Sequence, residues 1–126
     1  MNMTSSLSAI ARLDTTARSS AAVTHAGTGY FAITPERPYD ASLTTVQQAR
    51  QLFARAEKRL ADIGSGKDRL LFTAILLADL ADLVSFNAAW DEWLSDVAPP
   101  ARACFQADLA DPAMKVEMIV ICATIP

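Results

Sequence analysis

The chain has 126 residues, of which 52% are hydrophobic and 20% are charged, and its formal net charge at pH 7 is −3. This composition excludes a disordered chain, and the length predicts one domain that buries roughly two thirds of its unfolded surface. The 11 lysines and arginines are scattered, which argues against a basic surface that follows the phosphates of a nucleic acid.

The start of the chain gives no targeting signal. Residues 1–8 are small and polar, and we expect a disordered tail ahead of a single domain over residues 9–126. This segment lacks the regions of a signal peptide, and the longest apolar run, 70–78, is too short to cross a bilayer. We therefore expect a cytoplasmic protein without membrane contact, in which Cys104 and Cys122 are free thiols.

Three short strands are predicted at the start of the domain. They cover residues 9–13, 21–25 and 28–33, and a tight turn at Ala26-Gly27 joins the second to the third. A loop that contains two prolines follows.

The first helix is the clearest element of the pattern. Thr44 and Gln47 form a capping box at its start, and Gly64 supplies a left-handed stop after its end. The opposite side from its apolar stripe is polar, and Gln48 is assigned to that polar side. The stripe consists of Val46, Ala49, Leu52, Phe53, Ala56, Leu60 and Ile63.

The second half of the chain again contains a strand followed by a helix. Residues 69–77 are continuously apolar, which is typical of a strand covered on both faces. A second helix runs from an N-cap at Asp79 or Asp82 to about residue 94, and its inward stripe is predicted as Leu83, Asn87, Trp90 and Leu94.

Two final strands, over residues 102–109 and 114–124, complete the order. This order predicts an α+β fold in which two amphipathic helices pack on one face of a mixed six-stranded sheet.

Arg102 is the strongest candidate for chemistry. Arg102 and Cys104 share one face of their strand, so a guanidinium projects from the start of an apolar segment beside a thiol. Arginine at such a place suits bidentate capture of a carboxylate, and an ion pair with Glu117 on a neighbouring strand is the alternative. Cys104 has no nearby histidine to activate it as a nucleophile, because the only histidine is His25.

The second helix offers two further candidates. The amide of Asn87 either ties down a loop carbonyl or contacts a ligand, and Trp90 is most simply a core or interface aromatic. Nothing at metal-ligand spacing accompanies His25, and no glycine-rich phosphate loop is present. We therefore expect no metal and no cofactor.

Several segments together resemble the RidA/YjgF family of small trimeric proteins. The C-terminal part carries Pro-Ala-Arg-Ala-Cys at 100–104 and Lys-Val-Glu-Met at 115–118. Residues 77–82 and 87–93 resemble the strand-to-helix segment of the family, and residues 23–32 resemble its second hairpin. The resemblance implies a chorismate-mutase-like (RidA-like) fold and a homotrimer with ligand clefts between its subunits.

The resemblance, which covers about residues 9–124, also implies an activity. In this family the motif arginine, here Arg102, binds the substrate carboxylate, and Cys104 lines the pocket. We therefore predict a cofactor-independent enzyme that hydrolyses a reactive 2-imino or 2-enamino acid to a 2-keto acid and ammonia. The backbone near Cys104 is expected to position the water.

The chain departs from the family pattern at three positions. Glu117 is kept, but Ile119 stands where members typically carry a second glutamate that is thought to position the water. Ile33 lies in a run that usually contributes a backbone amide to the pocket, and a tyrosine of many members falls near Ser19. The lost carboxylate predicts weaker acid–base catalysis, and the two isoleucines predict a bulkier, more apolar, pathway-specific substrate.

These considerations define the predicted site and its alternatives. Arg102 and Cys104 are assigned to the reaction itself, and the substrate-binding set is Ile33, Asn87, Trp90, Arg102, Glu117 and Ile119. One alternative is a non-catalytic trimeric module that binds a small carboxylate such as a keto acid. Another is a divergent cofactor-independent reaction in the same cleft. The ribonuclease activity sometimes attributed to the family fits poorly with a net charge of −3.

Overall fold

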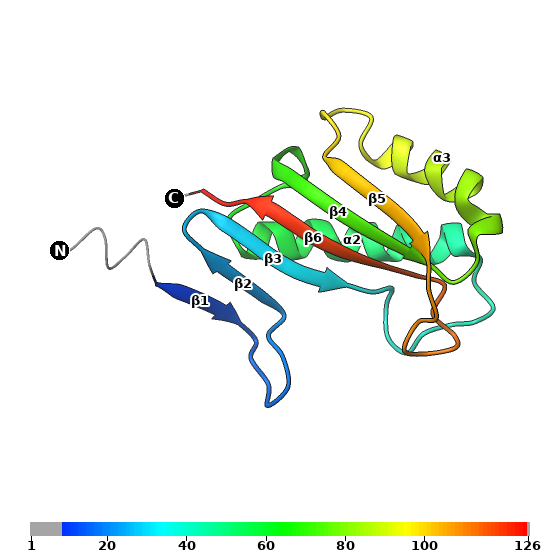
Figure 1. Cartoon of the computed structure of the whole chain (residues 1–126), viewed down its shortest axis with the longest axis horizontal. Coiled ribbons are helices and arrows are strands. Elements are labelled where there is room, and N and C mark those ends of the chain that lie inside the picture. The colour runs from blue at the N-terminus through cyan, green and yellow to red at the C-terminus, as the bar shows by residue number, and fades with distance from the viewer. Residues whose placement is uncertain (1–8, 126) are drawn as a thin grey trace.

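A computed structural model describes residues 9–125, so the predicted disordered tail over residues 1–8 lies outside the described residues. The described part of the chain forms a six-stranded sheet and two α-helices (Figure 1). In chain order the elements are β1 (Ile10–Leu13), β2 (Ala22–His25), β3 (Thr28–Ile33), α2 (Thr45–Asp62), η1 (Lys67–Arg69), β4 (Leu70–Leu77), η2 (Leu80–Asp82), α3 (Leu83–Trp93), β5 (Ala101–Gln106) and β6 (Val116–Ala123).

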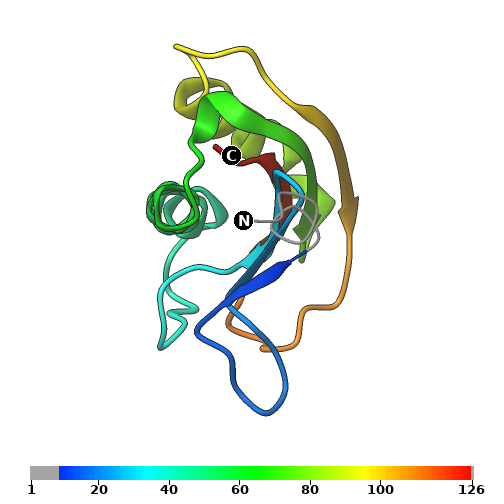
Figure 2. The same cartoon turned by 90° about the vertical axis from the view of Figure 1, so that its left-hand side faces the viewer.

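The sheet is mixed, as the order of elements predicts. Its strands lie in the order β1-β2-β3-β6-β4-β5, in which β4 and β5 run parallel and the other neighbours run antiparallel. Both helices pack on one face, and Figure 2 shows α2 standing to one side of the curved sheet. The α+β architecture is therefore confirmed. The last two strands are each shorter than predicted, and β5 ends at Gln106.

Local signals define α2 well. The Thr44 hydroxyl accepts a hydrogen bond from the Gln47 backbone N–H at 3.1 Å, and the Gln47 side chain accepts one from the Thr44 N–H at 2.9 Å. Gly64 follows the helix with a φ of +72°, a conformation that costs glycine little. Both the capping box and the stop are therefore confirmed.

The start of α3 agrees with the prediction, whereas its inward face differs. Asp79 caps the short 3₁₀ turn η2, where its Oδ1 accepts from the Ala81 N–H at 2.9 Å, and Asp82 is the N-cap residue of α3, which begins at Leu83. Phe86 is fully buried at the centre of the contact with α2, 6.0 Å from the ring of Phe53, while Asn87 is half-buried at its margin. Trp90 and Leu94 are buried as predicted, so the packed face of α3 is turned toward Phe86 and away from Asn87.

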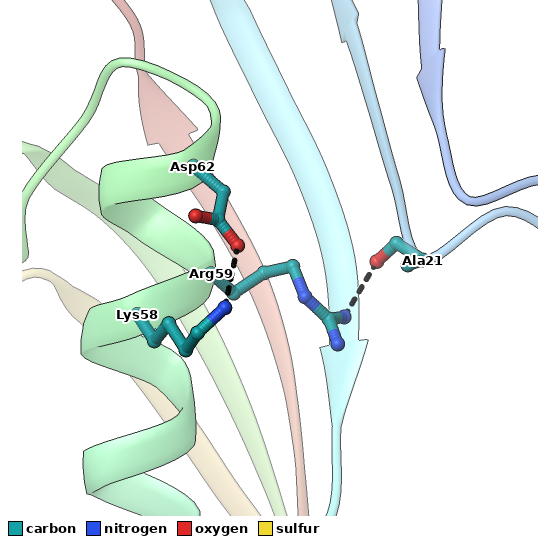
Figure 3. A network of polar contacts seen from close by, with 4 residues as sticks. All are labelled: Ala21, Lys58, Arg59 and Asp62. Carbon is teal, nitrogen blue, oxygen red and sulfur yellow. Dashed lines mark hydrogen bonds and ion pairs between the residues drawn. The ribbon is translucent and has the colours of Figure 1, made fainter.

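Two arginines of α2 hold the sheet and its loops against the helix. Arg59 donates to the carbonyl of Ala21 at 2.7 Å (Figure 3), and Arg55 donates to the carbonyl of Thr34 at 2.6 Å. Burial lowers the pKa of Arg59, yet an arginine remains charged at neutral pH. The exposed Lys58–Asp62 ion pair in the same view contributes little, because water screens it.

Gln48 is buried, although the sequence pattern places it on the polar side of α2. Its Nε2 donates to the carbonyls of Asp40 at 3.0 Å and Ala113 at 2.8 Å, and its Oε1 accepts from the Lys115 N–H at 2.8 Å. A fully buried amide with three backbone partners joins the β3–α2 loop to the loop before β6. Helical periodicity alone does not distinguish such an amide from a solvated one.

Replacing Gln48 with alanine is expected to lower the free energy of unfolding by roughly 3 kcal/mol, because buried backbone groups lose their partners. Urea unfolding followed by circular dichroism measures this change. Gln51→Ala is the matched control, since among the described residues Gln51 accepts only one long bond, from the Glu36 N–H at 3.3 Å, and its loss is expected to cost about 1 kcal/mol or less. Equal losses of stability in the two variants would contradict this role of Gln48 in joining the two loops.

The face of the sheet that is turned away from the helices is apolar over its central part, and we call it the open face. Residues paired across the ladder share a face, and this face carries Tyr30, Ala32, Phe72, Ala74, Leu76, Ala103, Phe105, Ile119 and Ile121. Tyr30, Phe105 and Ile119 are 43%, 46% and 43% exposed. In the single chain, β4 is thus covered by helices on one face only, and not on both as its composition predicts.

Candidate functional site

Arg102 lies near the start of β5, the outer strand of the sheet. Its guanidinium is 5.3 Å from the centre of the Trp90 ring, which is itself only 5% exposed. Such a cation–π contact orients the guanidinium on a rigid support while leaving its N–H groups outside. Among residues 9–125, Arg102 has no carboxylate within ion-pair distance. The arrangement therefore suits an external anion.

Cys104 lies on the same face of β5 as Arg102 and packs against the core. Burial raises the pKa of its thiol, and the nearby charge of Arg102 offsets only part of this effect. The side chain is therefore a neutral thiol at pH 7, which is a poor nucleophile.

The backbone of Cys104 has a different property. The Ala107 N–H donates to the Leu77 carbonyl at 3.0 Å, so odd-numbered residues of this strand bond to β4. Successive residues of a strand alternate, and the N–H groups of Arg102 and Cys104 therefore point to the free edge. A backbone donor and a guanidinium thus lie side by side at this edge.

The alternative role for Arg102, an ion pair with Glu117, is wrong. Arg102 pairs in register with Thr73 of β4, while Glu117 pairs with Leu76 of the same strand. Residues three apart on a strand face opposite sides of a sheet. Arg102 therefore lies on the helix side and Glu117 on the open face, with β4 between their strands.

Glu117 borders a second feature, a hollow of about 920 Å³ that is lined by residues of the β1–β2, β3–α2 and β5–β6 loops. We call it the Glu117 hollow. It is lined by Arg18, Ser19, Thr34, Arg37, Pro38, Tyr39, Ala110, Asp111, Met114 and Glu117. An adjoining hollow of about 340 Å³ reaches toward α2 and shares four of these residues, Ser19, Thr34, Arg37 and Glu117. The two hollows together offer polar groups and both signs of charge.

The two isoleucines of the predicted site lie on opposite faces. Ile33 is only 2% exposed and its side chain belongs to the core under the helices, although the residue lines the adjoining hollow together with Thr34 and Glu117. Its neighbour Ala32 pairs with Ile119, which is 43% exposed on the open face. The two isoleucine side chains therefore do not form one apolar wall within a single chain, because side chains alternate along a strand.

The two candidates on α3 have distinct environments. Trp90 is buried in an aromatic cluster with Phe53, Phe86 and Trp93, and its contact with Arg102 is its only link to the candidate site. Asn87 is half-buried, and its Oδ1 is buried without a hydrogen-bond partner among the described residues. Over residues 9–125 no group of three potential metal ligands is gathered, and no helix is long and apolar enough to span a bilayer.

Among the residues that line the Glu117 hollow, the sequence singles out Glu117 and Ser19 but neither Arg37 nor Thr34. They lie in the proline-containing segment after β3, where no periodic pattern assigns a direction to a side chain. The one sequence signal of a site in this segment is an arginine, Arg37, two residues before Tyr39.

Comparison with known proteins gives a consistent result. The family model described as Endoribonuclease L-PSP matches residues 3–124. A RutC family protein of Haemophilus influenzae is 40% identical over 113 residues, covering 89% of this chain and 96% of that protein. The RutC family protein YoaB of Escherichia coli is 37% identical over 115 residues, covering 90% and 97%. A crystal structure of a YjgF family member from Neisseria meningitidis has a TM-score of 0.85 at 31% identity and covers 95% and 98%.

Proposed function

Because the chain belongs to the RidA/YjgF family, we propose that it hydrolyses a reactive 2-imino or 2-enamino acid to the 2-keto acid and ammonia. The observation that carries this proposal is the unpaired guanidinium of Arg102, held on the Trp90 ring beside the outward N–H of Cys104. These donors suit a planar carboxylate, which every such substrate has. The comparisons establish the family, and the reaction and its substrate are our proposal.

The proposed site needs more than one subunit. Arg102 and Glu117 lie on opposite faces of the sheet in one chain, so a single chain does not bring both to one substrate. The open face is an apolar surface of the kind that oligomers bury. We propose a homotrimer in which Arg102 and Cys104 of one subunit reach the Glu117 hollow of its neighbour.

In this cleft each group has one task. Arg102 holds the carboxylate, and the Cys104 N–H donates to the carboxylate or to the water. Glu117 accepts a proton from water as the water oxygen adds to C2 of the protonated imine, which gives a neutral carbinolamine. The same carboxyl then returns the proton to nitrogen, and the hydroxyl proton passes to the departing ammonia as the C–N bond breaks, so the products are the keto acid and ammonium. This assignment uses the carboxylate that the chain keeps and does not require a second one at Ile119.

Replacing Cys104 with alanine is expected to leave kcat/KM within about threefold of the wild type, because a neutral, half-buried thiol supplies no nucleophile and the backbone N–H is retained. Ammonia release from imino acids measures this effect. A loss as large as that caused by a substitution at Arg102 would show that the thiol itself takes part in the reaction.

The proposal is tested by ammonia release from imino acids that an amino-acid oxidase generates in place. The expected result is accelerated release with the wild-type protein and a strongly reduced acceleration with Arg102→Ala. A well-folded oligomer that accelerates no imine hydrolysis would overturn the proposal and favour the binding module, for which calorimetry with keto acids is the direct assay.

Two further properties complete the proposal. The matching family model is described as an endoribonuclease, but a net charge of −3 with scattered cations does not favour binding to a phosphate backbone. We place the protein in the cytoplasm, where the free cysteines Cys104 and Cys122 stay reduced.

A further inference from the structure

The Glu117 hollow contains a second arginine, Arg37, that the proposed reaction does not use. We propose that Arg37 binds a carboxylate on the side chain of the substrate, so that the preferred substrate is a 2-imino dicarboxylic acid. This inference rests on the proposed function and specifies its substrate class.

Arg37 is held in position by its neighbours. Its Nε donates to the hydroxyl of Tyr39 at 3.0 Å, and its Cζ lies 5.6 Å from the centre of the Tyr39 ring. The Tyr39 hydroxyl in turn donates to Oγ1 of Thr34 at 3.1 Å, and Arg55 on α2 donates to the same Oγ1 at 3.0 Å. A chain of four side chains thus connects the guanidinium to the first helix. Because Nε is already bonded, the two terminal nitrogens remain as a fork for a carboxylate.

No protein carboxylate occupies that fork. Within residues 9–125, Arg37 is not within ion-pair distance of any aspartate or glutamate, although Glu117 and Asp111 line the same hollow. Asp111 is engaged elsewhere, since its Oδ1 accepts from the Ala113 N–H at 2.8 Å. Arg18 adds a second cation to the lining. An oriented guanidinium without a protein partner is the arrangement expected for binding an external anion.

The size and lining of the hollow favour a side-chain carboxylate. The α-carboxylate is assigned to Arg102 of the neighbouring subunit, so Arg37 is left for another group of the substrate. A volume of about 920 Å³ exceeds what a small imino acid needs and lies in the range of pockets for larger ligands. The case for an apolar substrate is correspondingly weaker, because Ile33 is buried in the core.

The test compares imino acids generated in place from glutamate and from leucine, with ammonia release as the readout. The wild type is expected to show a higher kcat/KM for the glutamate-derived imine. In Arg37→Gln the ratio of the two kcat/KM values is expected to fall by roughly tenfold to a hundredfold, as for loss of a hydrogen-bonded charge. Arg50→Gln, which changes an exposed arginine on α2 outside the Glu117 hollow, is expected to leave the ratio unchanged. An unchanged ratio in Arg37→Gln would overturn the inference.

A binding measurement separates this inference from the proposed reaction. Calorimetry with 2-oxoglutarate and 4-methyl-2-oxopentanoate is expected to show tighter binding of the dicarboxylate, and Arg37→Gln is expected to abolish that preference. If no imine is hydrolysed but the preference and its loss are seen, the reaction is wrong and the inference stands. If imines are hydrolysed and neither assay shows a preference, the reaction stands and the inference is wrong.

Discussion

Replacing Arg102 with alanine is expected to lower kcat/KM for imine hydrolysis by about 10²–10³-fold, the cost of removing one partner of a hydrogen-bonded charge pair. The guanidinium presents two parallel donors to a carboxylate, and Trp90 keeps it oriented. Arg102→Lys keeps the charge but not the fork, so it is expected to recover only part of the loss. Ammonia release measures both variants.

Structural readouts show whether the effect on activity is direct. Arg102 is exposed and its loss removes one cation–π contact, so the free energy of unfolding is expected to fall by about 1 kcal/mol or less. Arg50→Ala serves as the control for an exposed arginine elsewhere. Arg102→Ala with full activity would remove the anion-binding role, whereas a large loss of stability would indicate a structural role.

Replacing Phe105 with aspartate is expected to convert the proposed homotrimer to monomers and to abolish hydrolysis. Phe105 is 46% exposed at the margin of the open face, so the isolated chain tolerates the change while a subunit interface would have to bury an unpaired charge. Activity disappears with the trimer because the proposed cleft takes Arg102 and Glu117 from different subunits. Light scattering after size-exclusion chromatography measures the mass, and ammonia release measures the activity.

The matched control is Val84→Asp. Val84 is 82% exposed on α3, away from the open face, and the same new charge there is expected to leave both mass and activity unchanged. A monomeric Phe105→Asp protein with full activity would show that one chain suffices, and a trimeric one would show that the open face is not the interface.

Much of the fold could be predicted because its signals are local. Thr44, Gln47 and Gly64 determine where α2 begins and ends through backbone hydrogen bonds within a few residues. The apolar stripes and the order of elements then leave few arrangements for a sheet covered by two helices.

The predictions that failed concern side chains whose positions depend on contacts with residues far away in the sequence. Gln48 looks like a surface residue in the helical pattern, and only the loops that meet over it explain its burial. Ile33 is predicted to add apolar volume to the pocket, and it does line the hollow beside Glu117, but the phase of alternation along β3 turns its side chain into the core. A shift of one residue moves a side chain to the other face of a sheet, and no local signal sets that phase.

In the candidate site, too, some features follow from local sequence signals and others depend on the three-dimensional arrangement. Arg102 was identified because a charge at the start of an apolar strand is unusual, and Glu117 because of the resemblance. Their separation onto opposite faces depends on β4 lying between β5 and β6, which only the three-dimensional arrangement reveals. Arg37 lies in an irregular loop, so its approach to Glu117 had no periodic signal at all.

The most direct test of a cleft shared between subunits is complementation. Arg102→Ala and Glu117→Gln, each nearly inactive alone, are co-expressed with different tags so that mixed trimers assemble. Random mixing is expected to restore about a quarter of the wild-type activity, since a cleft is intact when one subunit supplies Arg102 and its neighbour supplies Glu117. Mixed trimers that stay as inactive as their parents would contradict the shared cleft.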